Sequence, residues 1–353
     1  MTGAWGAYAR PGPGEQATRP LVQGLLLRLV AVALLIAAAV AGDGGLLLAG
    51  AETRDYPGTP DYLDIDSVPP RPAAPAVGPD AATGSWDAPC GRNDSGHYNA
   101  DNLVVSPGRQ GGAEHLHDYV GNVSTTAYST DLDLALAATT CRNGDTSTYY
   151  WPVLGLLPGH YAGADHAYAR HAYARHAGGG HAGGGPVLPA SVLVRFLGSP
   201  RSKVVAMPRF LRMITGDAKA ATAPAPTATA AQWTCSGARD RRTERYPLCP
   251  PGQLVLRIFD FPSCWDGLHG DSPNHRSHVR FPAADGGCPD GTFPIPQLHI
   301  EVGYSVPAGR SYAIDTFPDQ RRSPRTDHAG FIDVMPEALM TKLVDCLNTG
   351  RHC

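Results

Sequence analysis

The stretch QLHIEVGYSV, residues 297–306, alternates polar and apolar side chains over its first six positions. Successive side chains of a strand point to opposite faces, so one face carries Gln297, His299 and Glu301 while the other carries only aliphatic residues. This alternation predicts a strand with one face in a hydrophobic core. The polar face either meets solvent or lines a cleft.

Further segments with the same character predict a mainly β fold. They are short, rich in branched and aromatic residues, and most stop at Pro or Gly; they cover residues 102–106, 191–198, 253–261 and 277–282. One helix is predicted near the carboxyl end, where Pro336 starts a segment with leucines at four-residue spacing and Gly350 follows it. We therefore predict a single sandwich or jelly-roll-like domain with long loops and a C-terminal α-helix.

The amino end predicts export. Arg10 and Arg19 precede an apolar run, residues 29–41, that ends in an Ala-x-Ala pattern. The run is shorter than the roughly 20 apolar residues of a membrane span. We predict that residues 1–41 are a cleaved signal peptide or an uncleaved signal anchor, the only segment in contact with a membrane. The rest of the chain is then secreted or displayed at the cell surface, and its formal charge of −3 does not suggest a nucleic-acid partner.

The cysteines agree with export, because an even number in an exported chain predicts disulfides. Eight cysteines allow 105 pairings, so the sequence alone leaves the connectivity open. Pairing neighbours is the simplest choice and leaves one long-range pair; the candidates are Cys235–Cys249, Cys264–Cys288, Cys346–Cys353 and Cys90–Cys141.

Three segments have biased composition. Residues 42–88 are Pro-rich and predict a disordered linker before a folded domain at 89–353. Within that domain, residues 217–232 form an Ala/Pro/Thr-rich loop. Residues 160–186 are a His/Gly-rich insert in which His166, His171, His176 and His181 recur every five residues. A step of five residues places successive imidazoles on different faces of a helix and also of a strand. We therefore interpret the insert as a flexible loop with adventitious metal affinity.

The segment GGAEHLHDYVGN, residues 111–122, contains the first candidate site. His115 and His117 are two residues apart, so both imidazoles point the same way from an extended chain. Two such histidines can begin a copper or zinc site, or act as a base and its orienting partner. Alternatively, they hydrogen-bond loop carbonyls at a polar strand end. Tyr119 is a candidate platform for stacking on a sugar ring.

The segment FPSCWDGLHGDSPNHRSHVRFP, residues 261–282, contains the second. His275 and His278 are three residues apart, a spacing that converges in a turn, and Asp271 could accept a hydrogen bond from either. Trp265 and Asp266 lie in a neighbouring turn, because the dipeptide Asp266-Gly267 is typical of turns. The whole chain lacks the GxSxG, HExxH, Walker A and EF-hand patterns, and no motif requires a cofactor.

These segments, together with SPGRQGGAEHLHDYVGN, STYYWPVLGLLPG, MPRFLRMITGDA and PIPQLHIEV, resemble the exported DUF1996 family of actinobacteria and fungi over residues 90–350. The resemblance implies an extracytoplasmic, disulfide-bearing domain of unestablished activity. Fungal relatives are often joined to wall-binding modules, which suggests work on glycans by association. The polar positions carried over are His115, Asp271, His275 and His278, with Trp265 and Asp266 in the turn.

The chain departs from this family at two places. The insert at 160–186 lies where relatives continue more directly. Relatives also commonly read His-x-Asp-Phe near the carboxyl end, whereas HAGF here begins at His328 and places Gly330 where the Asp would be. If the family's Asp at this position takes part in chemistry, its replacement by Gly330 puts the activity of this chain in doubt.

Our first hypothesis is that the domain acts on or binds cell-wall or extracellular polysaccharide through a His-rich cleft. Its acid–base residues would be His115, His117, Asp271, His275 and His278. Its binding residues would be Trp265, Asp266, Tyr119, His299, Glu301 and His328. The alternatives are a copper or zinc protein with His115 and His117 as ligands, or a structural module of the cell surface.

Overall fold

The computed structural model describes residues 61–157, 185–223, 231–307 and 310–353, all within one compact unit, Asp55–Cys353. The predicted signal segment 1–41, nearly all of the insert 160–186 and the middle of the 217–232 loop lie outside the described residues. Among the helices that the structure describes, none has both the length and the apolarity required to cross a membrane.

One five-stranded sheet is built around residues 297–304, the segment in which polar and apolar side chains alternate most clearly. Its central strand β15 (Gln297–Tyr304) pairs antiparallel with β7 (Ser191–Leu197) and β11 (Val255–Asp260). The edge strands are β2 (Ser85–Asp87) and β9 (Gln232–Cys235), in the order β2-β7-β15-β11-β9. The strands predicted at 191–198, 253–261 and 297–306 are therefore confirmed.

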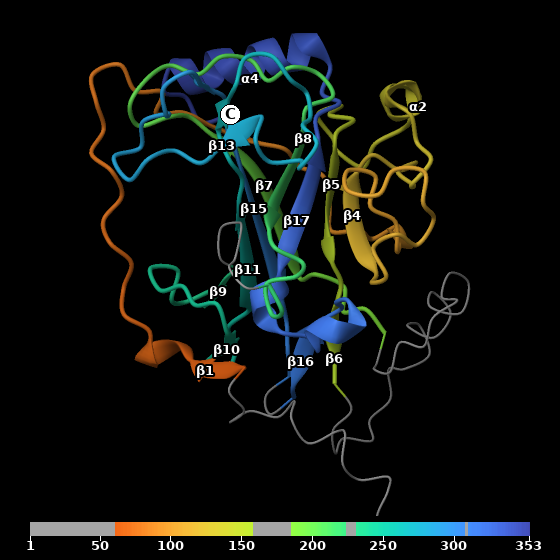
Figure 1. Cartoon of the computed structure of the whole chain (residues 1–353). Helices are drawn as coiled ribbons and strands as arrows, with labels where there is room; N and C mark the ends of the chain where they lie inside the picture. Colours follow the sequence, from red (N-terminus) through yellow and green to blue (C-terminus); the bar gives the residue numbers. More distant parts are fainter. Residues whose placement is uncertain (1–60, 158–184, 224–230, 308–309) are drawn as a thin grey trace, which may run out of the picture. The chain divides into compact units, whose positions relative to one another are not determined.

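The second five-stranded sheet brings distant parts of the chain together. Its order is β3-β4-β5-β17-β8, with all neighbours antiparallel. The strands are β3 (Tyr98–Asn99), β4 (His117–Gly121), β5 (Thr148–Pro152), β17 (His328–Ile332) and β8 (Arg212–Gly216). β5 lies between β4 and β17, so histidines 117 and 328 begin strands on either side of it (Figure 1).

Smaller elements complete the domain. β1 (Tyr62–Asp64) pairs with β10 (Tyr246–Leu248), β6 (Leu154–Leu156) with β16 (Tyr312–Ile314), and β12 (Cys264–Trp265) with both β13 (Val279–Arg280) and β14 (Phe293–Pro294). The helices are α2 (Asp131–Leu136) and α4 (Glu337–Asn348), and three single-turn 3₁₀ segments occur at Ile65–Ser67, Pro318–Gln320 and Pro324–Thr326. The predicted C-terminal helix is confirmed.

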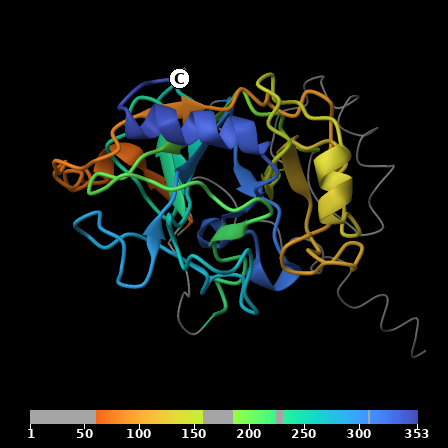
Figure 2. The ribbon, with the colours of Figure 1, turned by 90° about the horizontal axis from the view of Figure 1, so that it is seen from above.

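The two five-stranded sheets pack against each other as a sandwich. Aromatic side chains meet between them: the ring centroids of Phe196 and Phe331 are 6.2 Å apart, and those of Trp151 and Phe259 are 6.5 Å apart. Helix α4 crosses one end of this sandwich and buries Leu343 and Leu347 in the same core (Figures 1 and 2). A mainly β, single-domain sandwich with one C-terminal helix is thus what the chain forms.

The segment 102–106 is not the strand that its composition predicts. Residues 103–105 form a turn, and Leu103 and Val104 pack against Tyr119 and Tyr150 on the outer face of the second sheet. Their apolar character therefore reflects a second, smaller core. The segment 277–282 contributes only the two residues of β13.

Residues 61–88, predicted as the end of a disordered linker, are part of the folded domain. They carry β1 and β2, and they bury Tyr62, Ile65 and Val68. The Tyr62 hydroxyl donates to the carbonyl of Tyr312 at 2.5 Å. A few apolar anchors and strand pairing hold this Pro-rich segment in place, which composition alone does not reveal.

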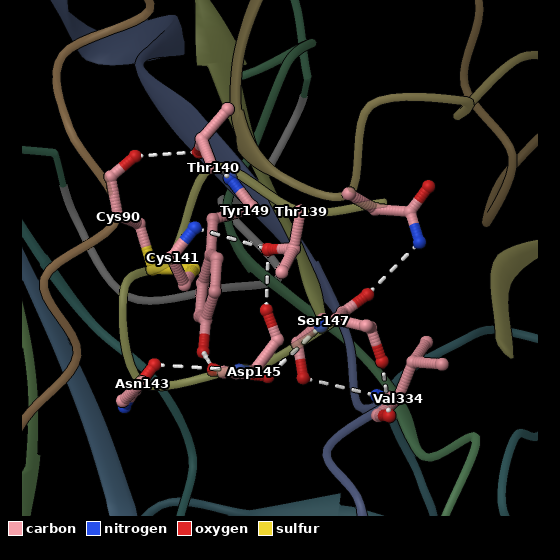
Figure 3. The surroundings of a disulfide bond; sticks show 12 residues. Cys90, Thr139, Thr140, Cys141, Asn143, Asp145, Ser147, Tyr149 and Val334 are labelled. Carbon is pink, nitrogen blue, oxygen red and sulfur yellow. Dashed lines mark hydrogen bonds between the residues drawn. A yellow bond between two sulfur atoms is a disulfide. The ribbon is translucent and has the colours of Figure 1, made fainter. Parts of the chain in front are cut away.

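The four disulfides are Cys90–Cys141, Cys235–Cys249, Cys264–Cys288 and Cys346–Cys353, so all four predicted pairs are confirmed. Around the first of them, Thr140 donates from Oγ1 to the Cys90 carbonyl at 2.6 Å (Figure 3). The same region contains the buried carboxylate of Asp145, which accepts hydrogen bonds from the Tyr149 hydroxyl and the Ser147 amide.

Candidate metal centre

Three histidines meet at one end of the second sheet. His117 is the first residue of β4 and His328 the first residue of β17, on either side of β5. His115 lies in a bend two residues before His117, and Val153 donates its backbone amide to the carbonyl of Leu116 between them. Local spacing thus brings two of the imidazoles together, and strand order adds the third.

The Nε2 atoms of these three side chains converge. The distances are 3.1 Å between His115 and His117, 3.2 Å between His115 and His328, and 3.5 Å between His117 and His328. The rings stand nearly perpendicular, with interplanar angles of 74°, 90° and 86°. His115 and His117 are buried, and His328 is half-buried.

Hydrogen bonds to backbone carbonyls determine which nitrogen carries the proton. The Nδ1 atom of His117 lies 2.9 Å from the carbonyl of Asp101, and that of His328 lies 2.8 Å from the carbonyl of Thr326. A carbonyl oxygen can only accept, so Nδ1 is the protonated atom and a neutral ring keeps its lone pair on Nε2. Burial lowers the pKa of His117 to about 3 and also lowers the pKa of His328, so both rings are neutral near pH 7.

The separations match three ligands of one small metal ion. With Zn–N bonds of 2.0–2.1 Å and tetrahedral angles, the ligand nitrogens lie about 3.3–3.4 Å apart. Carbonyls that accept from the other ring nitrogen are the usual outer partners of metal-bound histidine. Three protein ligands leave a fourth position for water or substrate, the arrangement of catalytic zinc sites.

Aromatic side chains surround the cluster. The ring centroid of Phe317 lies 5.0 Å from that of His115, and the ring centroid of Tyr150 lies 5.0 Å from that of His117. The ammonium of Lys219 sits 4.0 Å from the centroid of Phe317. The imidazoles are therefore held in a low-dielectric environment in which repulsion between their lone pairs is poorly screened.

Glycine at position 330 has a structural reason in this chain. Gly330 lies two residues after His328 on the same face of β17, opposite Tyr150 of β5. A Cβ atom added there would lie 2.1 Å from Cζ of Tyr150. The Tyr150 ring thus occupies the space beside the histidines that a side chain at 330 would need.

The second predicted constellation lies along the neighbouring strand β8. Nδ1 of His275 is 3.0 Å from both carboxylate oxygens of Asp271, and His275 has a φ of 54°, in the left-handed region. His278 does not join them. It is buried, and its Nε2 lies 2.7 Å from the Arg212 carbonyl while Nδ1 lies 2.9 Å from Ser272 Oγ.

Arg276 connects this loop to the histidine cluster through the sheet. Its guanidinium donates to the carbonyl of Gly216 at 2.8 Å, and Gly216 is the strand partner of His328. The two predicted histidine groups therefore lie along adjacent strands of one sheet, although only His115, His117 and His328 share a centre.

The remaining predicted site residues lie elsewhere. Trp265 is half-buried on β12 and donates its indole N–H to the carbonyl of His269, while Asp266 accepts from the amides of residues 268 and 269 and closes the turn. Tyr119 is buried and stacks on His97 and Tyr150, so neighbouring side chains cover its ring.

His299 and Glu301 belong to the outer face of the other sheet. His299 pairs with Asp260 at 2.6 Å, and Asp260 also pairs with Arg242 at 2.8 Å. Glu301 pairs with Arg239. Arginines from the loop after β9 thus cover the polar face of β15, which forms an ion-pair network away from the three-histidine centre.

A second group of potential ligand atoms is already bonded. The sulfurs of Cys90 and Cys141 lie close to the carboxylate of Asp145, but they form a disulfide and are not available as thiolate ligands (Figure 3). Within the described ranges, the histidine cluster is the only other group of three such atoms.

The family model "Domain of unknown function (DUF1996)" matches residues 102–324. The chain belongs to the DUF1996 family. No curated protein and no solved structure matches this DUF1996 chain. The matched range contains His115, His117 and the loop around His275, and it ends before His328.

Proposed function

We propose that this DUF1996 domain binds one zinc or copper ion on the Nε2 atoms of His115, His117 and His328. The observation that carries this proposal is the convergence of three ring nitrogens within 3.5 Å, two of them deprotonated by their carbonyl contacts. A proton on Nε2 of His115 can form a hydrogen bond to a facing nitrogen, but it does not separate the other two nitrogens. The lone pairs of His117 and His328 still face each other, and a cation relieves their repulsion.

The ligand set favours a reactive ion over a purely structural one. All three ligands are neutral imidazoles, so a divalent ion keeps its full charge in a buried site. Such an ion polarises a water molecule or a substrate oxygen in its fourth position. Half-burial of His328 leaves one side of the centre as a route to solvent.

Metal content of the purified chain tests the proposal. The five histidines of the insert are replaced by alanine in every variant, which prevents scavenging by the insert: His160, His166, His171, His176 and His181. We expect about one equivalent of zinc or copper after dialysis, and its loss in His115→Ala, His117→Ala and His328→Ala. His299→Ala is the matched control, because it removes a partly buried histidine from the other sheet.

Either of two results would contradict the metal centre. The parent chain could remain empty after exposure to both metals, or the three substitutions could leave the metal content equal to that of His299→Ala. Circular dichroism on every variant separates loss of ligand from loss of fold.

The domain is proposed to act outside the cytoplasm. The apolar run at 29–41 with its Ala-x-Ala end supports export, and four disulfides are compatible with an oxidising compartment. Cell fractionation with amino-terminal sequencing tests this and distinguishes a cleaved signal from an anchor. Recovery in the cytoplasm with an intact amino end would contradict it.

Glycan binding is a second candidate with a different surface. Leu268 is 80% exposed and Phe293 is 52% exposed, and Phe293 pairs across strands with half-buried Trp265. Exposed aromatic rings of this kind can stack on sugars. Sedimentation with purified wall polysaccharide should fall for Phe293→Ala and stay unchanged for Val123→Ala, an exposed residue that follows β4. Equal sedimentation of both variants would remove this candidate.

A further inference from the structure

A buried ion pair lies behind the histidine centre, between the two sheets. Arg257 of β11 donates from Nε and Nη2 to the two carboxylate oxygens of Asp327, at 3.0 and 2.5 Å. The side chains are 0% and 1% exposed. The rings of Trp233, Phe259 and Tyr304 surround the guanidinium, with centroids 5.3–5.9 Å from its central carbon.

The pair contacts the backbone on both sides of the centre. Asp327 accepts the backbone N–H of His328 at 3.0 Å on the same oxygen that takes the 2.5 Å contact from Arg257. The Nη1 atom of Arg257 donates to the carbonyl of Pro152 at 2.7 Å, and Pro152 is the strand partner of His117. One guanidinium therefore connects the strand positions of two of the three ligands.

We propose that Arg257 and Asp327 are positioning residues that set the spacing of His117 and His328 for a tetrahedral ion. This inference rests on the proposed metal function. Neither side chain touches the ion. They act through the Pro152 carbonyl and the His328 amide, which hold β5 and β17 at the separation that the Nε2 distances require.

A stability role alone does not explain the arrangement. Replacing a buried ion pair by apolar side chains is often neutral or stabilising, so burial is weak evidence that the pair exists for stability. The bidentate geometry and the additional carbonyl contact instead restrict orientation, which Arg provides and Lys does not. Mutation of a residue that hydrogen-bonds a metal ligand typically lowers metal affinity by about 10–100-fold.

The test compares two Asp→Asn changes in the full chain lacking the five insert histidines. Asp327→Asn disrupts the pair behind the centre, and Asp260→Asn disrupts the Arg242 and His299 pairs on the opposite face of the same sheet. Cobalt(II) is the probe, because a tetrahedral site absorbs visible light far more strongly than an octahedral one. Affinity is measured by zinc competition.

We expect Asp327→Asn to bind zinc about 10–100-fold more weakly and to lose the intense tetrahedral cobalt bands, while Asp260→Asn matches the parent. Arg257→Lys keeps the positive charge but loses the planar guanidinium that donates two parallel hydrogen bonds, so it should give an intermediate spectrum. This variant tests the proposal even if Asp327→Asn fails to fold. Leu343→Ala, which destabilises the core through α4 without touching the pair, should keep the parent spectrum.

The outcomes separate the two proposals. If the parent chain binds neither cobalt nor zinc, the metal function itself fails. If the parent binds and Arg257→Lys and Asp327→Asn both keep its spectrum and affinity, the positioning role is overturned. An equal loss in Leu343→Ala would also overturn it, because general destabilisation would then be sufficient.

Discussion

Buried polar side chains in this domain have protonation states imposed by their surroundings. Asp333 is fully buried and accepts from the backbone N–H of Met335, while its second oxygen has no hydrogen-bond partner among the described residues. Burial, followed by the nearby charge of Asp145, raises its pKa well above the ordinary value. Burial therefore favours the neutral form of Asp333, as it does for His117 with its lowered pKa.

Asp333→Asn should remove part of the pH dependence of stability. The pKa of Asp333 is raised on folding, so its stabilising contribution is full at low pH and is lost as pH rises toward the folded pKa. Asparagine has the same shape and no charge. We expect the variant to gain stability relative to the parent chain between pH 5 and pH 8, measured by urea unfolding.

A variant that follows the parent at both pH values would show that Asp333 is already charged at pH 5. Asp319→Asn, on an exposed 3₁₀ turn, is the control and should follow the parent.

Gly330→Ala should destabilise the domain by about 1–3 kcal/mol, because overpacking a filled site forces neighbouring atoms to move. The added Cβ would lie 2.1 Å from the Tyr150 ring, which is itself fixed by a 2.8 Å hydrogen bond to Asn102. Gly78→Ala is the control, since its nearest atom would be 3.6 Å away. Equal urea midpoints for the two variants would show that Tyr150 moves aside freely.

The residue pattern predicted part of the centre and missed the rest for a physical reason. The spacing of two residues predicted that His115 and His117 point the same way, and their imidazoles do meet although His115 lies in a bend. His328 is 213 residues from His115 and joins it only because β17 pairs with the strand that also pairs with β4. Strand order in a sheet is not written in local periodicity, so the third ligand entered only as a binding candidate.

At the scale of elements, local patterns predicted the long strands and the helix but not the segments that pack on a finished sheet. Helix α4 has a clear apolar stripe between Pro336 and Gly350, and its buried residues follow that stripe. Residues 102–106 have the composition of a strand but serve as an apolar cover. Composition cannot distinguish these two roles, because both bury aliphatic side chains.

Leu343→Ala should therefore cost about 2–5 kcal/mol, the range for removing a large aliphatic side chain from a filled core. Leu343 is 0% exposed, at the contact between α4 and the sandwich. Leu132 of α2 is 65% exposed, and Leu132→Ala should change stability by less than about 0.5 kcal/mol. Similar losses in both variants, by chemical unfolding, would contradict the assignment of α4 to the core.

At the scale of the whole molecule, the proposed metal binding should be coupled to folding. Two ligands begin strands of one sheet, and the pair behind them joins that sheet to the other, so the site exists only in the folded domain. An ion that binds the folded form alone stabilises it by about 2.7 kcal/mol at 100 times its Kd. Zinc should accordingly raise the melting temperature of the parent chain, but not that of His328→Ala.

In the chelator-treated domain, the pH dependences that His117 and Asp118 give to stability should oppose each other. Burial lowers the pKa of His117 to about 3, so its contribution is present above the unfolded value of 6.5 and is lost as pH falls below it. Burial raises the pKa of Asp118 to about 7 from 3.8, so its contribution is present at low pH and is lost as pH rises through that interval. Between pH 3.8 and 6.5, where both groups act, the two slopes are opposite and equal in size, so together these groups leave stability nearly level there.

Melting temperatures from pH 4 to 9 in EDTA test this compensation. In His117→Gln the Asp118 slope is no longer offset, because glutamine takes up no proton on unfolding, so the melting temperature should fall more steeply between pH 4 and 6.5 than in the parent. Exposed His352→Gln should follow the parent. Each unit of pKa shift corresponds to about 1.4 kcal/mol, so the His117 effect is large enough to resolve. An identical acid slope in His117→Gln and the parent would mean that His117 is already protonated in the fold, and a protonated imidazole cannot bind a metal.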